Sequence, residues 1–596
     1  RAPDRKRGRK RTRSEAPEEV SGNLMGLLAG DVEMSPSDSI PPAGDDEPGF
    51  GDPGFGDPDA DPGFGDPDAD PGFGDPDVAA GYPGDEVEDE LVAAGLAEPR
   101  ARGERSSTFK WVVVALIGLL IGGGGLGGYL WYRSYKFVQG KWSQVRVAIH
   151  KSTPAGYRAA RKAAETIVTH RGEDARASAA VAMCHAAMAV EFGADELEQA
   201  KKVLESTTGN DSEWRTAARA FLSLVDEPAQ AVGYLQKGLE VYPRSALLNY
   251  LKGRALAGSG EPQRAAEAYQ AALKLVPGYV APQIALATLM GRTEASLAAG
   301  IATLDKVLDK DPNNLQALLV RARLRARHGK DLDAAAAEAG KVTGELSEKA
   351  SKGQLGWAHL VLATVARHKQ LAVQPLKQRD WSTVNQELDA AIASPPRFDA
   401  AFRYELAGEL MQVYRMPDAA EQMRAAVDLK AKVPAYLHRQ ARVLLELGDP
   451  VKAGNALKQA PARLLETRFL LGWQAHARRT YAKAVDLLTR VLNEQPDHVE
   501  AATILARSMA RQKKITAALK RLDQLAAKHP RDHRVRLAQA RILLWTGKLG
   551  KMHGALKAAW GITRRDPAAQ TLSGLRSLRM HDLATARKRF ERALAT

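Results

Sequence analysis

The sequence predicts an all-α protein, in which an array of repeated helix pairs follows one transmembrane helix and a disordered acidic N-terminal region. Three observations support this fold class. Residues 1–99 are rich in Pro, Gly and Asp and show no sustained apolar period. Residues 111–131 carry no charge. The length of this segment is close to the about 20 residues that a helix needs to cross a bilayer. From about residue 155 to the end, apolar residues recur at helical spacing in units of about 34 residues.

The N-terminal region has two parts of opposite charge. Residues 1–14 form a basic arm with a net charge of +7, whereas residues 15–99 contain 24 acidic residues and no Lys or Arg. Because the whole chain carries +14, residues 100–596 carry +31. A field of that sign favours acidic partners or anionic surfaces without identifying them.

A short acidic repeat, Pro-Gly-Phe-Gly-Asp, recurs in this region, as at residues 53–57, 62–66 and 71–75. Asp-rich glycine repeats are consistent with calcium sites, since hard cations prefer carboxylate oxygens. A calcium-binding β-helix, however, needs an apolar residue on each turn, and here Pro interrupts every unit. The repeat therefore favours a solvated acidic linker, with its phenylalanines as candidate docking points for a partner.

The uncharged segment predicts a membrane helix over residues 111–132. Lys110 and Arg133 bracket it, and Trp and Tyr lie at its ends, where membrane helices carry aromatic belts. Residues 100–110 are then a basic juxtamembrane linker, and residues 133–154 a helical linker to the repeats.

Glycines inside this segment predict close packing between membrane helices. Glycines four residues apart share a helix face, so two helices can approach each other closely there. The glycines concerned are Gly118, Gly122, Gly123, Gly124, Gly127 and Gly128. Self-association through the membrane is the hypothesis, and a flexible anchor is the alternative. The formal match to a dinucleotide-binding fingerprint is set aside, because that motif needs a preceding strand.

The flanking charges leave the orientation open, because the flanks hold four Lys and Arg on each side. The basic arm resists translocation, which favours a cytoplasmic N-terminus and an exported array. The heavy use of Ala, Arg, Gly and Pro suggests a GC-rich bacterium. The expected location is the bacterial inner membrane, as a single-pass protein with a periplasmic array. Because the chain starts with Arg1, we expect further residues to precede it.

Two segments, residues 246–279 and 465–498, show the repeat most clearly. Small residues stand at the eighth and twentieth places, a large apolar or aromatic residue at the twenty-fourth, and Pro at the thirty-second. These residues are Gly253, Ala265, Tyr269 and Pro277 in the first segment, and Gly472, Ala484, Leu488 and Pro496 in the second. The pattern resembles the tetratricopeptide repeat, a helix–turn–helix unit of about 34 residues.

The resemblance implies a right-handed α-solenoid over residues 155–596, with roughly 11 to 13 repeats. The period weakens over residues 345–400, and the stretch 344–381 predicts longer helices or an insertion. A proline is expected after the second helix of a unit, because Pro cannot continue a helix. Further unit ends are therefore predicted at Pro243, Pro312 and Pro434.

No catalytic constellation stands out, so we predict no enzyme activity, no cofactor and no metal site. The sequence lacks His-Glu-x-x-His, a phosphate-binding loop and Gly-x-Ser-x-Gly, and its 13 histidines share no ligand spacing. Cys184 is the single cysteine, which excludes an internal disulfide. Its Ala-rich surroundings predict a small core residue.

The resemblance also places a candidate binding surface on the first helix of each unit, whose ninth and thirteenth places face a concave groove in this family. The residues there are Arg254, Arg323, Arg327, Arg442, Trp473, Arg507, Arg511 and Arg541, with Trp545 as a further anchor. Guanidinium groups bind carboxylates in a forked geometry, so the hypothesis is a groove for acidic, extended segments. The alternative is that an Arg-rich chain places Arg on every solvated helix face.

These features predict a membrane-anchored scaffold or adaptor that binds proteins in a cell-envelope assembly. One alternative is an accessory or regulatory subunit of an envelope enzyme or polymer-export machine, and another is an enzyme whose catalytic part precedes Arg1. The acidic residues 15–99 are a candidate ligand of the groove if both lie on one side of the membrane. Nucleic acid is a disfavoured partner, because no nucleic-acid-binding motif is present.

Overall fold

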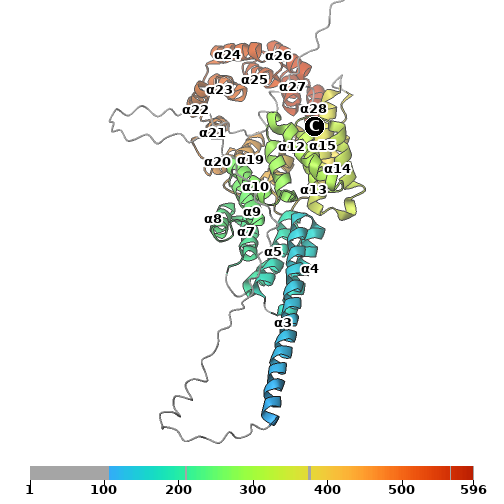
Figure 1. Ribbon diagram of the computed structural model, residues 1–596. Helices are drawn as coiled ribbons and strands as arrows, with labels where there is room; N and C mark the ends of the chain where they lie inside the picture. Colours follow the sequence, from blue (N-terminus) through green and yellow to red (C-terminus); the bar gives the residue numbers. More distant parts are fainter. Residues whose placement is uncertain (1–106, 173, 208–210, 374–377, 564–565, 595–596) are drawn as a thin grey trace, which may run out of the picture. The chain divides into compact units, whose positions relative to one another are not determined.

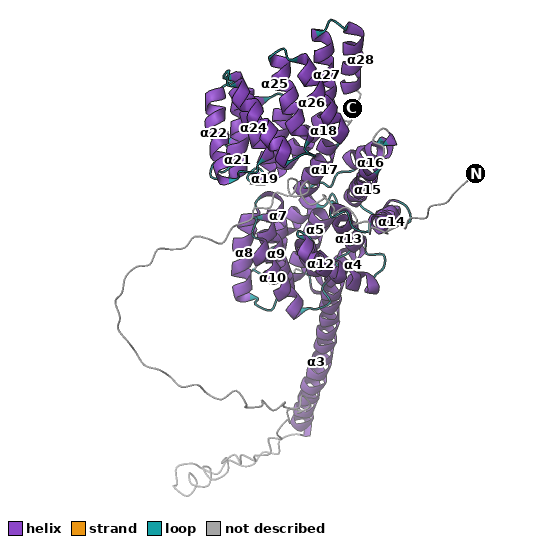
Figure 2. Cartoon of the chain, turned by 90° about the horizontal axis from the view of Figure 1, so that it is seen from above, coloured by secondary structure: helices purple, strands orange, loops and turns teal. Residues whose placement is uncertain are grey.

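The computed structural model describes residues 107–172, 174–207, 211–373, 378–563 and 566–594, and the side chains from residue 128 onwards. The predicted acidic region 1–99 lies outside the described residues. Throughout the described part the chain forms helices and no strand (Figure 2). The prediction of an all-α solenoid is therefore confirmed.

The first described helix, α3 (Ser107–His150), is 44 residues long (Figure 1). The predicted membrane span, residues 111–132, falls within it, but the side chains before residue 128 are not described. Within the part of the chain that the structure describes, no helix is long and apolar enough to cross a membrane. Of the predicted packing glycines, Gly128 has no other group within 4 Å of the place where a Cβ would stand. The surroundings of the other five are not described.

The C-terminal part of α3 belongs to the folded array. Val138, Trp142, Val145 and Ile149 are buried, and their spacing of three or four residues places them on one helix face. They join a hydrophobic cluster with residues of the first repeats. Thr153 then caps α4 by accepting a hydrogen bond from the backbone N–H of Gly156.

The array consists of helix pairs in chain order, in which each first helix packs on its own second helix. The helices of the first half are α4 (Pro154–Arg171), α5 (Ala175–Phe192), α6 (Leu197–Ser206), α7 (Glu213–Asp226), α8 (Pro228–Val241), α9 (Ala246–Gly258), α10 (Pro262–Leu275), α11 (Val280–Met290), α12 (Glu294–Lys310), α13 (Leu315–Arg327), α14 (Leu332–Thr343), α15 (Lys352–Ala372) and α16 (Ser382–Ala393). A short 3₁₀ turn, η1 (Ser347–Lys349), precedes α15.

The second half continues in the same way. Its helices are α17 (Ala400–Gln412), α18 (Met416–Leu429), α19 (Pro434–Glu446), α20 (Pro450–Leu457), α21 (Leu465–Ala477), α22 (Tyr481–Glu494), α23 (Val499–Arg511), α24 (Ile515–Lys528), α25 (His533–Trp545), α26 (Leu549–Ile562), α27 (Pro567–Arg579) and α28 (Leu583–Leu594). From α5/α6 to α27/α28 the described helices make twelve consecutive pairs, which agrees with the number expected from the period.

The small residue at the eighth place allows the two helices of a pair to touch. A Cβ added to Gly253 would collide with the ring of Tyr269, at the twenty-fourth place of the same unit. At Gly472 it would lie 2.8 Å from Leu488, which again occupies the twenty-fourth place. The glycine at the eighth place thus leaves room for the bulky residue at the twenty-fourth place of the same unit to pack against the first helix.

The turn between the helices of a pair also repeats. The fifteenth residue has a positive φ in eight units, a conformation that glycine adopts without steric strain. Glycine occupies it at Gly260, Gly329, Gly448 and Gly547, and other residues at Tyr414, Arg479, Lys513 and His581.

Two predictions concern irregular stretches of the array. The weak period after residue 344 reflects a longer helix, since α15 extends over 21 residues. The expected unit end at Pro434 is wrong: this residue stands in the first turn of α19 instead of following α18. Pro is favoured there because the first helical N–H groups have no partner within the helix.

The prediction for Cys184 is confirmed. It is fully buried in α5 among alanines that are buried on several sides of the helix. Burial raises the pKa of its thiol well above the usual range, so the thiol stays protonated at neutral pH.

Candidate functional site

The first helices of neighbouring pairs contact one another from α5 to α17 and again from α19 to α27. The residues predicted to face the groove, which we call the ladder residues, occupy equivalent positions on these helices. The ninth residue of the helix is Arg254 in α9, Arg323 in α13, Arg442 in α19, Trp473 in α21, Arg507 in α23 and Arg541 in α25. The thirteenth is Arg327 in α13, Arg511 in α23 and Trp545 in α25.

Arg254 is neutralised inside the chain. Its Nη1 forms an ion pair with Glu191 from α5 and donates to the hydroxyl of Tyr250 at 3.0 Å. Tyr250 in turn donates to Glu191 at 3.0 Å. This closed network leaves Arg254 little capacity for an external carboxylate.

Arg323 and Arg327 lie beside a third arginine, Arg292. The guanidinium of Arg323 stands 4.6 Å from the ring centroid of Trp357, a cation–π distance. Burial lowers the pKa of Arg292, and the charges of Arg327 and Arg323 lower it further. These two ladder residues form no ion pair with the described residues.

Arg442 is the centre of an ion-pair network. Its Nη1 lies 2.9 and 2.8 Å from the two carboxylate oxygens of Glu500, and its Nη2 lies 3.0 Å from Glu466. Arg534 also binds Glu500, at 2.7 Å. Burial alone would raise the pKa of Glu500, but Arg442 and Arg534 hold it at about 2. For the same reason the two carboxylates raise the pKa of Arg442 against the effect of burial.

Arg507, Arg511 and Arg541, which we call the C-terminal arginine cluster, differ from Arg442. None of the three has an ion pair with the described residues, and the buried Nε of Arg507 has no hydrogen-bond acceptor among them. Burial lowers the pKa of Arg507 to about 9, with Arg541 as the next largest cause. Arg507 remains charged at neutral pH, so three positive charges lie together with Glu446 as their nearby acidic group.

Aromatic side chains flank this cluster. The guanidinium of Arg511 lies 3.6 Å from the ring centroid of Trp545. Trp473, half-buried in α21, has its ring 6.1 Å from that of Phe469. Burial lowers the pKa of His476 to about 3, assisted by the neighbouring arginines, so this histidine is neutral and its Nδ1 is 2.8 Å from the Ser508 hydroxyl.

The register of the repeats explains why Arg507 lacks the two ion-pair partners that Arg442 has. Arg442 is bound by the second residue of the next first helix, Glu466, and of the one after, Glu500. For Arg507 the equivalent residues are Arg534 in α25 and Ala568 in α27. At the two places where Arg442 meets Glu466 and Glu500, Arg507 therefore has Arg534 and Ala568, and neither can form an ion pair with it.

The structure therefore divides the predicted ladder into neutralised and free parts. This division is decided by charged residues that the sequence pattern did not single out, namely Glu191, Glu466, Glu500 and Arg534. The recurrence of charged residues at the second place of α21, α23 and α25 was a visible signal for three of them. Glu191 carried no such signal.

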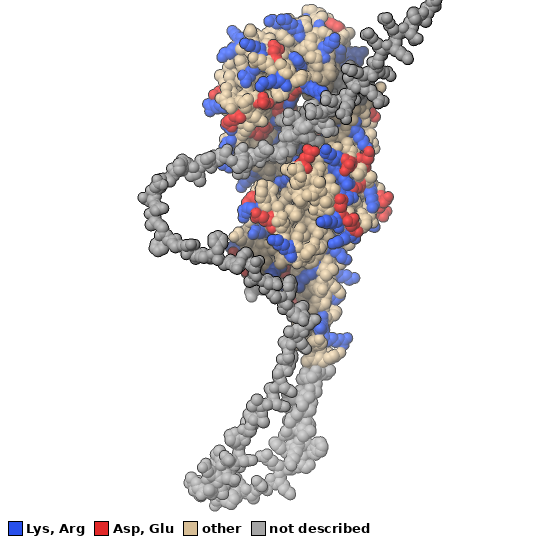
Figure 3. All heavy atoms as spheres, turned by 45° about the horizontal axis from the view of Figure 1, so that its top comes forward, with Lys and Arg blue, Asp and Glu red and all other residues tan. Residues whose placement is uncertain are grey.

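Charge elsewhere on the described surface is mixed. On the face in Figure 3, Lys and Arg side chains are interspersed with Asp and Glu, without one continuous basic patch. Among the described residues no group of three or more His, Cys, Asp and Glu could hold a metal ion. The C-terminal arginine cluster, like Arg323 and Arg327, thus has no ion-pair partner among the described residues.

Comparisons with solved structures and curated proteins add little at the level of whole chains. A chain in the crystal structure of the APC/C hetero-tetramer Cut9–Hcn1 is 14% identical, with 74% of this chain and 76% of that chain covered and a TM-score of 0.31. A tetratricopeptide repeat protein from Parabacteroides merdae is 17% identical, with 39% and 92% covered and a TM-score of 0.29. No curated protein matches the chain.

Comparison with protein families is more specific. Two models, both of the tetratricopeptide repeat, match residues 214–280 and residues 475–542. The first segment covers the pairs α7/α8 and α9/α10. The second contains the pair α23/α24 and the three residues of the C-terminal arginine cluster. The chain therefore contains tetratricopeptide repeats, a unit that generally mediates contacts between proteins.

Proposed function

We propose that the chain is a non-catalytic, membrane-anchored adaptor whose C-terminal arginine cluster binds an acidic, extended segment of a partner protein. The observation that carries this proposal is that Arg507 and Arg541 have no ion-pair partner among the described residues, whereas Arg442 has two. Uncompensated guanidinium groups on a partly buried surface favour an anionic ligand, because its carboxylates replace the missing counter-charges.

The spacing of the cluster constrains the ligand. Adjacent packed helices lie about 8–10 Å apart, so Arg507 and Arg541 present their charges at roughly that separation along the array. An extended peptide advances about 3.3 Å per residue. Acidic side chains about three residues apart therefore match the two arginines, and an apolar side chain between them can pack on Trp473 or Trp545.

The binding test uses a labelled peptide of this chemistry and the full chain in detergent. Residues 53–75 supply a suitable sequence, since they are acidic, free of Lys and Arg, and contain Phe. R507Q/R541Q should weaken binding at least tenfold, or about 1.4 kcal/mol, as measured by fluorescence anisotropy at fixed ionic strength. The matched control is R521Q/R531Q, which removes two exposed arginines from the same repeats.

The outcomes are distinct. The proposal is supported if R507Q/R541Q alone loses affinity for the acidic peptide. A peptide in which Asn replaces each Asp should show no such difference between the variants. Equal losses in both double variants would show general attraction to a basic surface instead. A single-stranded oligonucleotide that displaces the peptide and binds more tightly would identify nucleic acid as the ligand.

The anchor is the second part of the proposal, and it rests on the sequence of residues 111–132. We place this helix in a bacterial inner membrane, with a cytoplasmic N-terminus and the array in the periplasm as part of an envelope assembly. A reporter fused after Thr596 that is active only outside the cytoplasm tests the orientation. An inactive but stably produced fusion would reverse it, and recovery of the full chain without membranes would refute the anchor.

A further inference from the structure

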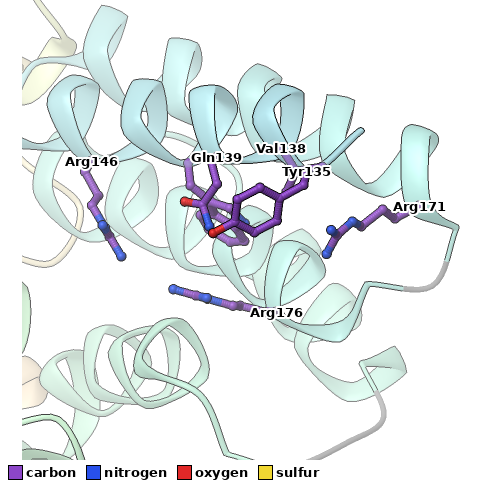
Figure 4. A pocket seen from close by; sticks show the side chains of 7 residues that line it. Tyr135, Val138, Gln139, Arg146, Arg171 and Arg176 are labelled. Atoms are coloured by element: carbon purple, nitrogen blue, oxygen red, sulfur yellow. The ribbon is translucent and has the colours of Figure 1, made fainter. Parts of the chain in front are cut away.

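A basic pocket lies where the C-terminal part of α3 meets the end of α4 and the start of α5. It encloses about 190 Å³ and is lined by Tyr135, Gln139, Trp142, Arg146, Arg171 and Arg176. In Figure 4 the three arginines, one from each helix, lie around the side chains of Tyr135 and Gln139. At about 30 Å³ per water molecule, this space holds a few waters that an anion could displace.

Positive charge dominates the described lining of the pocket. Among the described residues, which leave out residue 173, no Asp or Glu lines it. Arg146 and Arg176 have no ion pair with the described residues, and Arg171 approaches Asp174 only at 4.0 Å. Arg171 and Arg176 are exposed, so an anion can reach them from solvent.

The ring of Trp142, at the bottom of the pocket, holds the guanidinium of Arg176 in place. The guanidinium of Arg176 lies 4.6 Å from the ring centroid of Trp142. Trp142 is 5% exposed and stacks on Trp214 of α7, with ring centroids 5.6 Å apart. A cation held over a buried aromatic ring keeps its N–H donors available at the ring edge, so less rotational entropy is lost when a ligand binds.

We infer that this pocket binds a phosphate group of an anionic ligand, gripped by Arg146, Arg171 and Arg176, with the Gln139 amide as a further donor. Arginine suits this role because its planar fork of N–H groups matches phosphate oxygens. The site is separate from the C-terminal arginine cluster and goes beyond the proposed binding of an acidic segment, while the assignment of a lipid as the source of the phosphate rests on the proposed membrane anchor.

The position of the pocket along α3 favours a lipid headgroup as the source of that phosphate. Tyr135 follows the last residue of the predicted span, 132, by three positions, and Gln139 by seven. With a rise of 1.5 Å per residue, Tyr135 lies about 5 Å and Gln139 about 10 Å beyond the span, so the end of the pocket nearest the span reaches the headgroup layer. A free phosphate is the other possible source of the same chemistry.

The test titrates the full chain, in zwitterionic detergent, with two probes by calorimetry. One probe is inorganic phosphate, and the other is dihexanoyl-phosphatidylglycerol, a soluble anionic lipid. R146Q/R171Q/R176Q should weaken the affinity for whichever probe binds the parent chain at least tenfold. The control R244Q/R424Q/R463Q removes the same charge from exposed arginines elsewhere and should change that affinity less than twofold. The near-ultraviolet circular dichroism of the stacked tryptophans reports whether the variants keep their fold.

Each result has one meaning. Pocket-dependent binding of the lipid, at least tenfold tighter than that of phosphate, supports the inference and assigns the headgroup. Pocket-dependent binding of phosphate with no preference for the lipid supports it and assigns a free phosphate. If neither probe binds, or if both triple variants lose binding equally, the inference is wrong. Binding of the acidic peptide should be unchanged in R146Q/R171Q/R176Q, which separates this site from the adaptor function.

Discussion

Arg442 and Arg507 occupy the same place on first helices two repeats apart, yet their surroundings are opposite. Arg442 is held by Glu466 and Glu500 at 2.8–3.0 Å, and the carboxylates raise its pKa. Arg507 has no ion pair with the described residues, and burial lowers its pKa to about 9. One repeat position thus serves two purposes: where the next units supply acids the arginine stabilises the array, and where they do not it is available to a ligand.

The difference also predicts how stability and binding are distributed. A charge that the protein itself neutralises contributes to folding, and removing it leaves buried partners unpaired. A charge that the protein leaves unpaired works against folding and is retained at a cost in stability when it serves binding. The following experiments separate these two situations, from the largest expected effect to the smallest.

Replacing Arg442 should produce the largest loss of stability. R442Q leaves the carboxylates of Glu500 and Glu466 without their main partner, and we expect the unfolding free energy to fall by about 3 kcal/mol. Urea denaturation followed by circular dichroism measures it. R468Q, which breaks an exposed ion pair with Glu494, is the control and should cost less than about 1 kcal/mol. Similar losses in the two variants would contradict the central role of Arg442.

The Arg442 network also makes stability depend on pH in the acid range. The pKa of Glu500 is about 2 in the folded protein, below its ordinary value of 4.5. Its contribution is therefore present above pH 4.5 and disappears as the pH falls from 4.5 through 2, on the order of 2 kcal/mol. E500Q should flatten the unfolding free energy over that window, whereas D486N, at an exposed pair, should leave the slope unchanged. An unaltered slope in E500Q would exclude this assignment.

A carboxylate placed at the second residue of α27 should convert the free part of the ladder into the neutralised kind. Ala568 is the register equivalent of Glu500, so A568E offers an internal partner to the C-terminal arginine cluster. We expect it to compete with the acidic peptide and to weaken binding about tenfold, roughly 1.4 kcal/mol. A568Q has the same size without charge and should bind as the parent chain does. Peptide anisotropy distinguishes the two variants, and equal affinities would contradict the register argument.

Removing Arg507 should have the smallest effect and the opposite sign to removing Arg442. R507Q relieves the repulsion from Arg541, so the free protein should gain about 1 kcal/mol of stability while it loses affinity for the acidic peptide. Urea denaturation of R507Q beside R442Q measures the contrast directly. A loss of stability in both variants would show that Arg507 is a structural residue.

Much of the fold follows from spacing in the sequence. Gly253 and Tyr269 stand at fixed places of the predicted repeat, and the structure shows that a Cβ at Gly253 would meet the Tyr269 ring. Such contacts join residues less than one repeat apart, so the period alone reveals them. Pro434 was misplaced because a proline fits both the end of one helix and the start of the next, and only the observed helix bounds separate the two.

The candidate site was predicted only in outline. The resemblance to the tetratricopeptide repeat placed Arg442, Arg507 and Arg541 at equivalent positions of first helices, and the helix bounds agree. The pocket around Trp142 had no signal in the sequence, because Arg146, Arg171 and Arg176 come from three helices and share no common period.

The sequence by itself determined which residues stand at each place of the repeat, because a place depends only on counting along a helix of fixed geometry. The tertiary structure alone decided which arginines are neutralised. The carboxylates that bind Arg442 lie 24 and 58 residues away, on the next two first helices. Whether such residues meet depends on how successive helices stack, and an ion pair forms only when that stacking brings both charges within a few ångströms of each other.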